Sequence, residues 1–121
     1  MKIMIVDDSK AMRMIIVRTL RQAGYGDHTL VEAASGPEAI GKLSKGEDPD
    51  VILCDWNMPE MTGLDLLKRV KVEWPKTKLG FVTSESSDKF RSAAAQEGAA
   101  FFLCKPFTPE GLKAALSPVL G

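Results

Sequence analysis

The sequence predicts an α/β fold in which five parallel strands form one doubly wound sheet with helices on both faces. Five short apolar runs alternate with amphipathic segments of helical length. Continuous apolar runs are typical of strands that are buried on both sides. A helix in every connection makes neighbouring strands parallel, and right-handed crossovers place helices on both faces. We expect the strand order 2-1-3-4-5, which is common among sheets of this kind.

The apolar runs mark the expected strands, and capping residues mark the helices between them. The strands are expected at Lys2–Val6, Thr29–Ala34, Val51–Cys54, Leu79–Val82 and Ala99–Cys104.

Residues suited to helix ends stand at both ends of the intervening segments. The first helix follows Ser9, a suitable N-cap, and ends at Gly24, a suitable C-terminal cap. The second begins at Ser35, with Glu38 at capping-box spacing. The remaining helices are expected from Thr62 to about Trp74, from Ser86 to Gly98, and from Pro109 onward with fraying at Pro118.

Length and composition narrow the class of protein. The 121 residues suit one domain, 1–121, and 16 Lys plus Arg balance 16 Asp plus Glu. Zero net charge gives no reason to expect nucleic acid as a partner. No apolar stretch is long enough to cross a membrane, and acidic residues come too early for a signal peptide. We therefore expect a cytoplasmic monomer that ends after its fifth helix without a DNA-binding segment.

Three isolated residues are given structural interpretations. Cys54 and Cys104 lack the spacing of a metal or redox motif, so we expect both to be small buried residues. His28 stands alone at the start of the second strand and is expected at the surface or the sheet edge.

Polar side chains stand at the ends of four of the five expected strands. The first strand ends in Asp7 and Asp8, the third in Asp55, the fourth in Thr83 and the fifth in Lys105. Parallel strands end on one edge of a sheet, and ligands bind there where the strand order reverses. Three carboxylates brought together repel one another unless cations or protons compensate. A hard divalent cation with oxygen ligands, Mg²⁺ above all, fits this set.

The same residues suit phosphoryl transfer onto Asp55, the central acid. A carboxylate beside Mg²⁺ and lysine can attack a phosphoryl group and form an acyl phosphate. Lys105 supplies positive charge, and the Thr83 hydroxyl can donate to a phosphoryl oxygen. Taken singly, Asp7 and Asp8 could instead cap the first helix, and Lys105 could be a counter-ion of Asp55. Their combination at matching strand ends favours a site.

Four segments resemble the response-regulator receiver family, in particular its single-domain, CheY-like members. They are Ile5–Ser9, Asp55–Gly63, Val82–Glu85 and Cys104–Phe107, and the resemblance covers essentially the whole chain. It implies the flavodoxin-like (βα)5 fold, with the strand order given above. It also implies that the chain is not an enzyme beyond catalysing its own phosphorylation and dephosphorylation.

The resemblance implies a role for each site residue. Asp7, Asp8 and Asp55, with the backbone carbonyl of Asn57, would hold Mg²⁺ or Mn²⁺, and Asp55 would be phosphorylated. Pro106 would follow a cis peptide bond.

The resemblance also implies a switch. Thr83 would move toward the phosphoryl group while Phe102 rotates inward, as a shift between two packings. Single-domain chemotaxis members have Tyr where this chain has Phe102, so contacts through that hydroxyl are absent. Asn57 and Glu85 occupy positions that tune phosphate loss, and both match a fast self-dephosphorylating member.

Partners are implied at the level of class. A sensor histidine kinase or a histidine phosphotransferase would supply the phosphoryl group. The fourth helix, fifth strand and fifth helix would contact a downstream protein, with Lys89, Arg91, Phe102 and Lys113 as candidate residues. A flagellar switch component is one candidate partner, and a phosphorelay or phosphate-sink role is the alternative.

Three other functions remain as weaker alternatives. A haloacid-dehalogenase-type phosphatase uses similar residues, but its general acid would stand at Asn57, and Asn cannot protonate a leaving group. A flavodoxin-like FMN carrier needs a phosphate-binding loop after the first strand, where Asp7 and Asp8 would repel phosphate. A receiver that acts by binding alone is disfavoured by the complete set of site residues.

Overall fold

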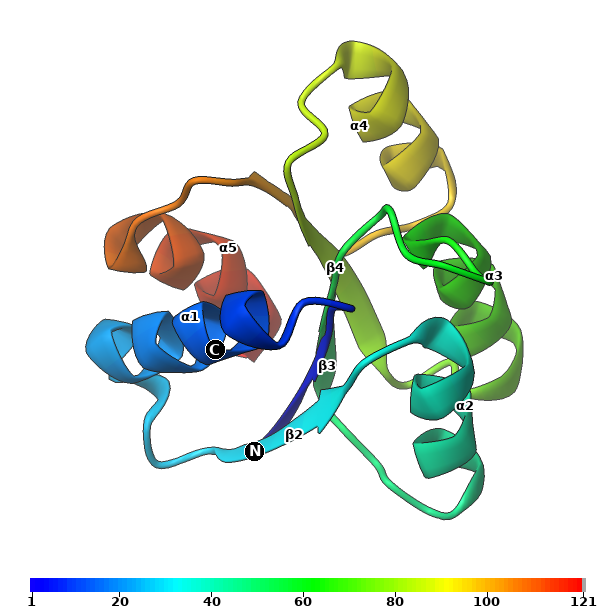
Figure 1. Cartoon of the computed structure of the whole chain (residues 1–121), viewed down its shortest axis with the longest axis horizontal. Helices are drawn as coiled ribbons and strands as arrows, with labels where there is room; N and C mark the ends of the chain where they lie inside the picture. Colours follow the sequence, from blue (N-terminus) through cyan, green and yellow to red (C-terminus); the bar gives the residue numbers. More distant parts are fainter. Residues whose placement is uncertain (121) are drawn as a thin grey trace.

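A computed structural model of the chain describes residues 1–120 and confirms the expected fold (Figure 1). Five parallel strands form one sheet in the order β2-β1-β3-β4-β5. The strands are Lys2–Val6 (β1), Thr29–Ala33 (β2), Val51–Cys54 (β3), Lys78–Thr83 (β4) and Phe102–Cys104 (β5). The helices are Lys10–Leu20 (α1), Gly36–Ser44 (α2), Gly63–Glu73 (α3), Asp88–Gln96 (α4) and Pro109–Leu120 (α5). None of the helices among these residues is long and apolar enough to span a membrane.

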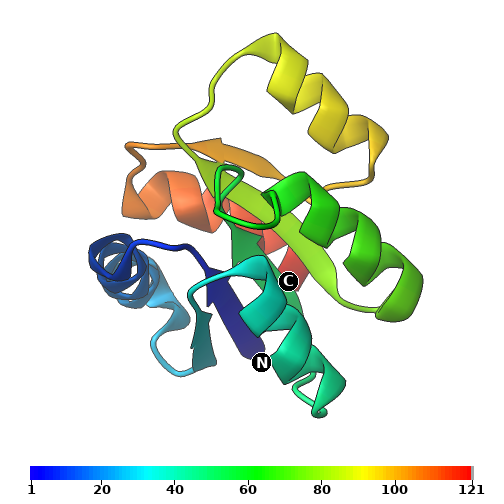
Figure 2. The ribbon, with the colours of Figure 1, turned by 45° about the vertical axis from the view of Figure 1, so that its right-hand side comes forward.

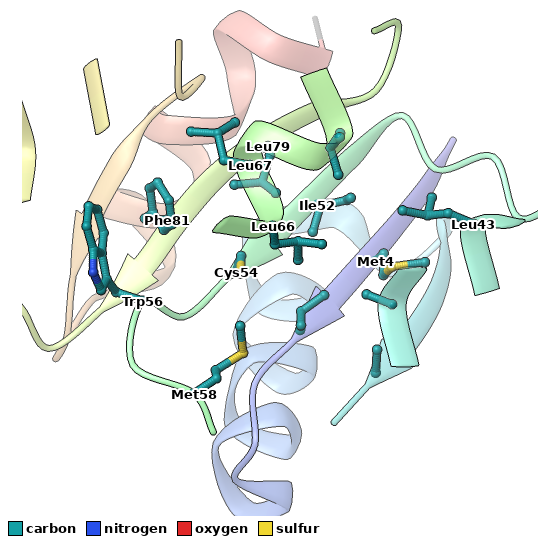
Figure 3. Close-up of a cluster of buried hydrophobic side chains, with 14 of the residues drawn as sticks. Met4, Leu43, Ile52, Cys54, Trp56, Met58, Leu66, Leu67, Leu79 and Phe81 are labelled. Atoms are coloured by element: carbon teal, nitrogen blue, oxygen red, sulfur yellow. The ribbon is translucent and has the colours of Figure 1, made fainter. Parts of the chain in front are cut away.

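The helices divide between the two faces of the sheet, with α1 and α5 on one face and α2, α3 and α4 on the other (Figures 1 and 2). Alternate residues of β1 serve the two faces, as the two-residue period of a strand requires. Met4 and Val6 pack into the core beneath α2 and α3, drawn in Figure 3, whereas Ile3 and Ile5 pack against α1 and α5. This burial on both sides explains the continuous apolar runs in the sequence.

Strand boundaries differ from the expected ones mainly in β5. The regular ladder between β4 and β5 begins at Phe102, three residues after the expected start at Ala99. The preceding residues approach β4 through single bonds, such as the Ala100 N–H to the Leu79 carbonyl at 2.8 Å. Since Gly98 has a φ of 81°, the chain is still leaving α4 there. β4 is longer than expected at both ends, because Lys78 pairs with β3 and Thr83 pairs with β5.

One helix end agrees with the sequence prediction and another departs from it. After α1 the chain adds a wide turn, Arg21–Tyr25, in which Gly24 adopts a φ of 100°, so Gly24 ends the helix as expected. The expected fraying at Pro118 is wrong, because α5 continues through Pro118 to Leu120. Buried Leu116 and partly buried Val119 pack on the α1 side of the core and stabilise this last turn.

Candidate functional site

The ends of four strands bring separate polar groups to one edge of the sheet. Asp7 directly follows β1, Asp55 directly follows β3, Thr83 ends β4 and Lys105 directly follows β5. β1 and β3 are neighbours, and the helices that follow them, α1 and α3, pack on opposite faces of the sheet. The strand order reverses at this point, which is where open parallel sheets bind ligands.

Three carboxylates converge at this edge. Asp7, Asp8 and Asp55 each contribute one oxygen to a group in which all lie within 4.8 Å of one another. Asp7 is buried, Asp55 is half-buried and Asp8 is exposed, so the group faces solvent on one side. The Ser9 N–H donates to Asp7 Oδ1 at 2.9 Å, and the Trp56 N–H donates to Asp55 Oδ1 at 2.8 Å. These backbone bonds orient the two less exposed carboxylates.

Lys105 is the cation of the cluster. Its Nζ lies 2.9 Å from Asp7 Oδ2 and 3.5 Å from Asp55 Oδ2, and its side chain is 14% exposed. The Lys105 N–H donates to the Thr83 carbonyl at 2.8 Å, and the peptide bond to Pro106 is cis. Three carboxylates beside one ammonium leave two negative charges uncompensated. At low dielectric that excess favours a divalent cation.

Side chains also link the loops after β3 and β4. Asn57 Nδ2 donates to Glu85 Oε1 at 2.6 Å, and the Glu85 N–H donates to Thr83 Oγ1 at 3.3 Å. Thr83 is fully buried, whereas Asn57 is exposed. The Thr83 hydroxyl therefore accepts from the loop after β4, and the Asn57–Glu85 hydrogen bond ties that loop to the loop after β3.

An aromatic cluster begins at Trp56, the residue that follows Asp55. The Trp56 ring lies 4.8 Å from the Phe81 ring and 5.0 Å from the Phe90 ring, measured between centroids. Figure 3 shows Trp56 beside Phe81 at the end of β4. Phe102 extends the cluster, with its centroid 6.0 Å from that of Phe81. The cluster therefore connects the neighbourhood of Asp55 with α4 and β5.

The adjacent residues Phe101 and Phe102 serve opposite faces of the sheet. Phe102 packs with the core that contains Trp56, whereas Phe101 packs with the core beneath α1 and α5. The guanidinium carbon of Arg91 lies 4.9 Å from the Phe102 ring centroid, a cation–π contact between α4 and β5. Only Phe102 of the pair lies in the aromatic cluster.

The two cysteines have different environments. Cys54 is fully buried, as expected, and burial raises the pKa of its thiol well above the usual value, with Asp55 and Asp7 adding to the effect. The expectation that Cys104 is buried is wrong, since it is partly exposed and its Sγ lies 3.0 Å from Arg91 Nη2. β5 is an edge strand and is covered less completely than the central strands.

His28 immediately precedes the edge strand β2, close to where the sequence placed it. Its ring is partly buried beside Tyr25, at a centroid distance of 5.4 Å.

Arg13 contacts the site but was not among the expected site residues. Its Nη1 donates to the Asp7 carbonyl at 2.6 Å and its Nε to Glu32 Oε1 at 2.9 Å, with the side chain 13% exposed. The sequence holds a signal for it, because Arg13 stands three residues before Ile16 and seven before Leu20. That spacing places a charged residue on the buried face of α1.

Comparisons with known proteins agree with this geometry. The family described as the response regulator receiver domain matches residues 3–117. A chemotaxis protein CheY homolog of Campylobacter jejuni is 43% identical over 123 residues, covering all of this chain and 93% of the relative. Chemotaxis protein CheY1 of Helicobacter pylori is 42% identical, covering all of this chain and 98% of the relative. The solved structure of Vibrio cholerae CheY4 has a TM-score of 0.85 and 37% identity, covering 98% of each chain.

A doubly wound sheet with an acidic cluster and a lysine at its switch point fits the class of signalling receiver domains that the matching family describes. The chain belongs to the response regulator receiver family, and its relatives include CheY-type chemotaxis regulators. Members of this family accept phosphoryl groups, bind Mg²⁺ in an acidic pocket and act as signalling proteins rather than classical enzymes. CheY-like members interact with kinases and switch components.

Proposed function

We propose that this chain is a phosphorylation-controlled switch in which Asp55 accepts the phosphoryl group. The observation that carries the proposal is the contact of one ammonium, Lys105 Nζ, with both Asp7 and Asp55 inside a cluster of three carboxylates. A purely structural counter-ion would need one acid, whereas this cluster retains negative charge that a second cation must balance. Asp55 is the acceptor because it directly follows the central strand β3, between the acids that follow β1 and Thr83 at the end of β4.

The donor set fits a hard divalent cation. Every candidate ligand is an oxygen, with Asp7, Asp8 and Asp55 supplying carboxylates and Asn57 its backbone carbonyl, which favours Mg²⁺ or Mn²⁺. When bound, the cation supplies positive charge beside the oxygens of the transferred group. The exposed side of the cluster, at Asp8, is where the metal and the phosphodonor would enter.

The chain itself positions the acceptor and neutralises charge. An Asp55 carboxylate oxygen forms a bond to phosphorus while the P–N bond of a phosphohistidine donor breaks and the imidazole leaves with the bonding electron pair. Lys105 Nζ, now shared between two carboxylates, then pairs with a phosphoryl oxygen. The Thr83 hydroxyl, which accepts a hydrogen bond from the Glu85 N–H, donates a hydrogen bond to another phosphoryl oxygen.

The aromatic cluster suits transmission of this change to the surface. Movement of Thr83 toward the phosphoryl group would free space into which Phe102 rotates, at the end of the cluster that starts beside Asp55. The change would alter the α4–β5–α5 face, including Lys89, Arg91 and Lys113, where a downstream protein binds.

The relatives indicate the setting of the switch. Their names are those of chemotaxis proteins, which favours a cytoplasmic regulator that receives phosphoryl groups from a sensor histidine kinase and binds a flagellar switch component. A phosphorelay or phosphate-sink role, with a histidine phosphotransferase as partner, is the alternative. Reverse transfer from the phosphorylated chain to a purified histidine phosphotransferase would favour that alternative.

The Asn57–Glu85 pair supports rapid loss of the phosphoryl group. Asn57 is exposed and donates to Glu85, so the pair lies on the side of the site that water can reach, and both residues match those of a fast self-dephosphorylating receiver. We expect a phosphorylated half-life of seconds to minutes without a phosphatase, measured by loss of the phosphorylated mass after the donor is removed. A half-life of many hours at neutral pH would contradict this expectation.

Acetyl phosphate provides a direct test of the acceptor and the metal. The wild-type chain, incubated with acetyl phosphate and Mg²⁺, should show a single phosphoryl adduct by intact mass. Asp55→Asn and excess EDTA should each abolish the adduct, while Asp88→Asn, which changes an exposed acid in the first turn of α4, should retain it. An adduct that survives Asp55→Asn or EDTA would refute the assignment of the acceptor or of the metal.

A further inference from the structure

We propose that Arg13 is a positioning residue that holds the acidic loop 7–9 in the shape that binds the divalent cation. The inference rests on the metal site proposed above and concerns a residue that is not itself a metal ligand. Arg13 touches the site through the backbone, and it connects that backbone to the neighbouring strand β2.

The first contact satisfies a buried carbonyl at the end of β1. The ladder between β1 and β2 ends with the Asp7 N–H donating to the Ala33 carbonyl at 3.2 Å, after which the chain turns away toward α1. The Asp7 carbonyl then accepts from Arg13 Nη1 at 2.6 Å, and Asp7 is only 1% exposed. A hydrogen bond from a charged donor is stronger than a neutral one, and a buried carbonyl without a partner is costly.

The second contact anchors the guanidinium itself. Arg13 Nε donates to Glu32 Oε1 at 2.9 Å, and Glu32 lies on β2 in register with Ile5 of β1. The planar guanidinium presents donors in a fixed fork, so it can hold a carbonyl and a carboxylate in one geometry where a lysine ammonium cannot. The Arg13 N–H also donates to the Ser9 carbonyl at 3.0 Å, which joins the first turn of α1 to the same loop.

The Arg13 contacts with the Asp7 carbonyl and with Glu32 determine where the Asp7 and Asp8 carboxylates point. The peptide unit between Asp7 and Asp8 contains the carbonyl that Arg13 holds, so displacement of that unit would move the backbone from which both carboxylates project. The Ser9 N–H bond to Asp7 Oδ1 depends on the same turn. Groups that orient metal ligands contribute strongly to affinity even though they do not touch the ion.

Removing Arg13 separates positioning from simple electrostatics, because the two predict opposite results. Loss of a positive charge beside three carboxylates should tighten Mg²⁺ binding if charge were the only contribution. Loss of positioning should weaken it, and we expect Arg13→Met to raise the Mg²⁺ dissociation constant about tenfold. Arg18→Met is the matched control, since Arg18 lies on the same helix, carries the same charge and is exposed. It should bind Mg²⁺ as tightly as wild type or slightly more tightly.

The dissociation constants are measured by calorimetric titration of the full chain with MgCl₂ at constant ionic strength. Amide hydrogen exchange without metal provides a second readout, in which residues 7–9 should exchange faster in Arg13→Met than in Arg18→Met. An unchanged or lowered dissociation constant in Arg13→Met would overturn the proposal. If Arg13→Met does not fold, Arg13→Lys is the second variant, because it keeps the positive charge but lacks the planar set of guanidinium donors. Wild-type Mg²⁺ affinity in Arg13→Lys would also overturn the proposal. Absence of Mg²⁺ binding by wild type would instead refute the metal site.

Discussion

A methyl group at Gly63 should disturb the fold and the acceptor together. Gly63 is the first residue of α3, and its N–H donates to the Trp56 carbonyl at 2.8 Å. A Cβ added at this position would lie 2.2 Å from the Asp55 carbonyl oxygen and 2.7 Å from Phe81 Cε1. The first obstacle is backbone and the second is a fully buried ring, so neither can move without shifting the loop that carries Asp55.

The expected cost follows from that geometry. Insertion of one methyl group into a well-packed site costs about 1–3 kcal/mol, and a backbone obstacle places Gly63→Ala at about 3 kcal/mol. For a domain of this size that loss would lower Tm by roughly 10 °C. Displacement of the Asp55 carbonyl should also slow phosphorylation by acetyl phosphate at saturating Mg²⁺.

Gly41 provides a control in which the same substitution should raise stability instead of lowering it. It lies inside α2, and an added Cβ there would meet nothing within 4 Å. Gly41→Ala should therefore stabilise the chain by about 0.5–1 kcal/mol through the better helix propensity of alanine. Urea unfolding followed by circular dichroism measures both variants. A Gly63→Ala chain within 1 kcal/mol of wild type would refute the steric argument.

Two further results are expected. Lys105→Met leaves buried Asp7 without its cation, so it should lower the free energy of unfolding in EDTA by about 3 kcal/mol. Lys2→Met removes only the half-exposed ion pair with Glu47, so it should lower the free energy of unfolding by less than about 1 kcal/mol. Added Mg²⁺ should narrow the Lys105→Met deficit, and equal deficits for the two lysine variants in EDTA would contradict the assignment. Iodoacetamide at pH 8 should label Cys104 in the folded chain and leave Cys54 unlabelled until denaturant is added, because Cys54 is fully buried and the pKa of its thiol is raised. Rapid labelling of a folded Cys104→Ser variant would show that Cys54 is accessible.

The fold class and the edge of the sheet that carries the site were predictable because their signals are local. Continuous apolar runs identify strands buried on both faces, and Ser9, Ser35 and Thr62 each accept a hydrogen bond at the start of a helix. Once the strands are parallel, topology alone requires Asp7 and Asp55 to end on the same edge. No knowledge of side-chain packing is needed for that step.

The boundaries of β5 and α5 were less predictable because tertiary contacts override local preference there. Ala99–Phe101 are apolar and are predicted as strand from the sequence, yet in the structure the chain is still turning from Gly98 toward β4. Pro118 lacks an N–H and would weaken an isolated helix, but the packing of Leu116 holds the last turn in place.

The sequence by itself determined the five strand–helix units and the acids, hydroxyl and lysine at their ends, because period, capping and strand topology are encoded locally. Only the tertiary structure decided which neighbours those groups meet: Arg13 with the Asp7 carbonyl and Glu32, Asn57 with Glu85, and Phe102 rather than Phe101 with the aromatic cluster. These contacts join segments distant in sequence, and their distances depend on how helices pack on the sheet. Hydrogen bonds and ring contacts act over a few ångströms, so the partners cannot be known before that packing is.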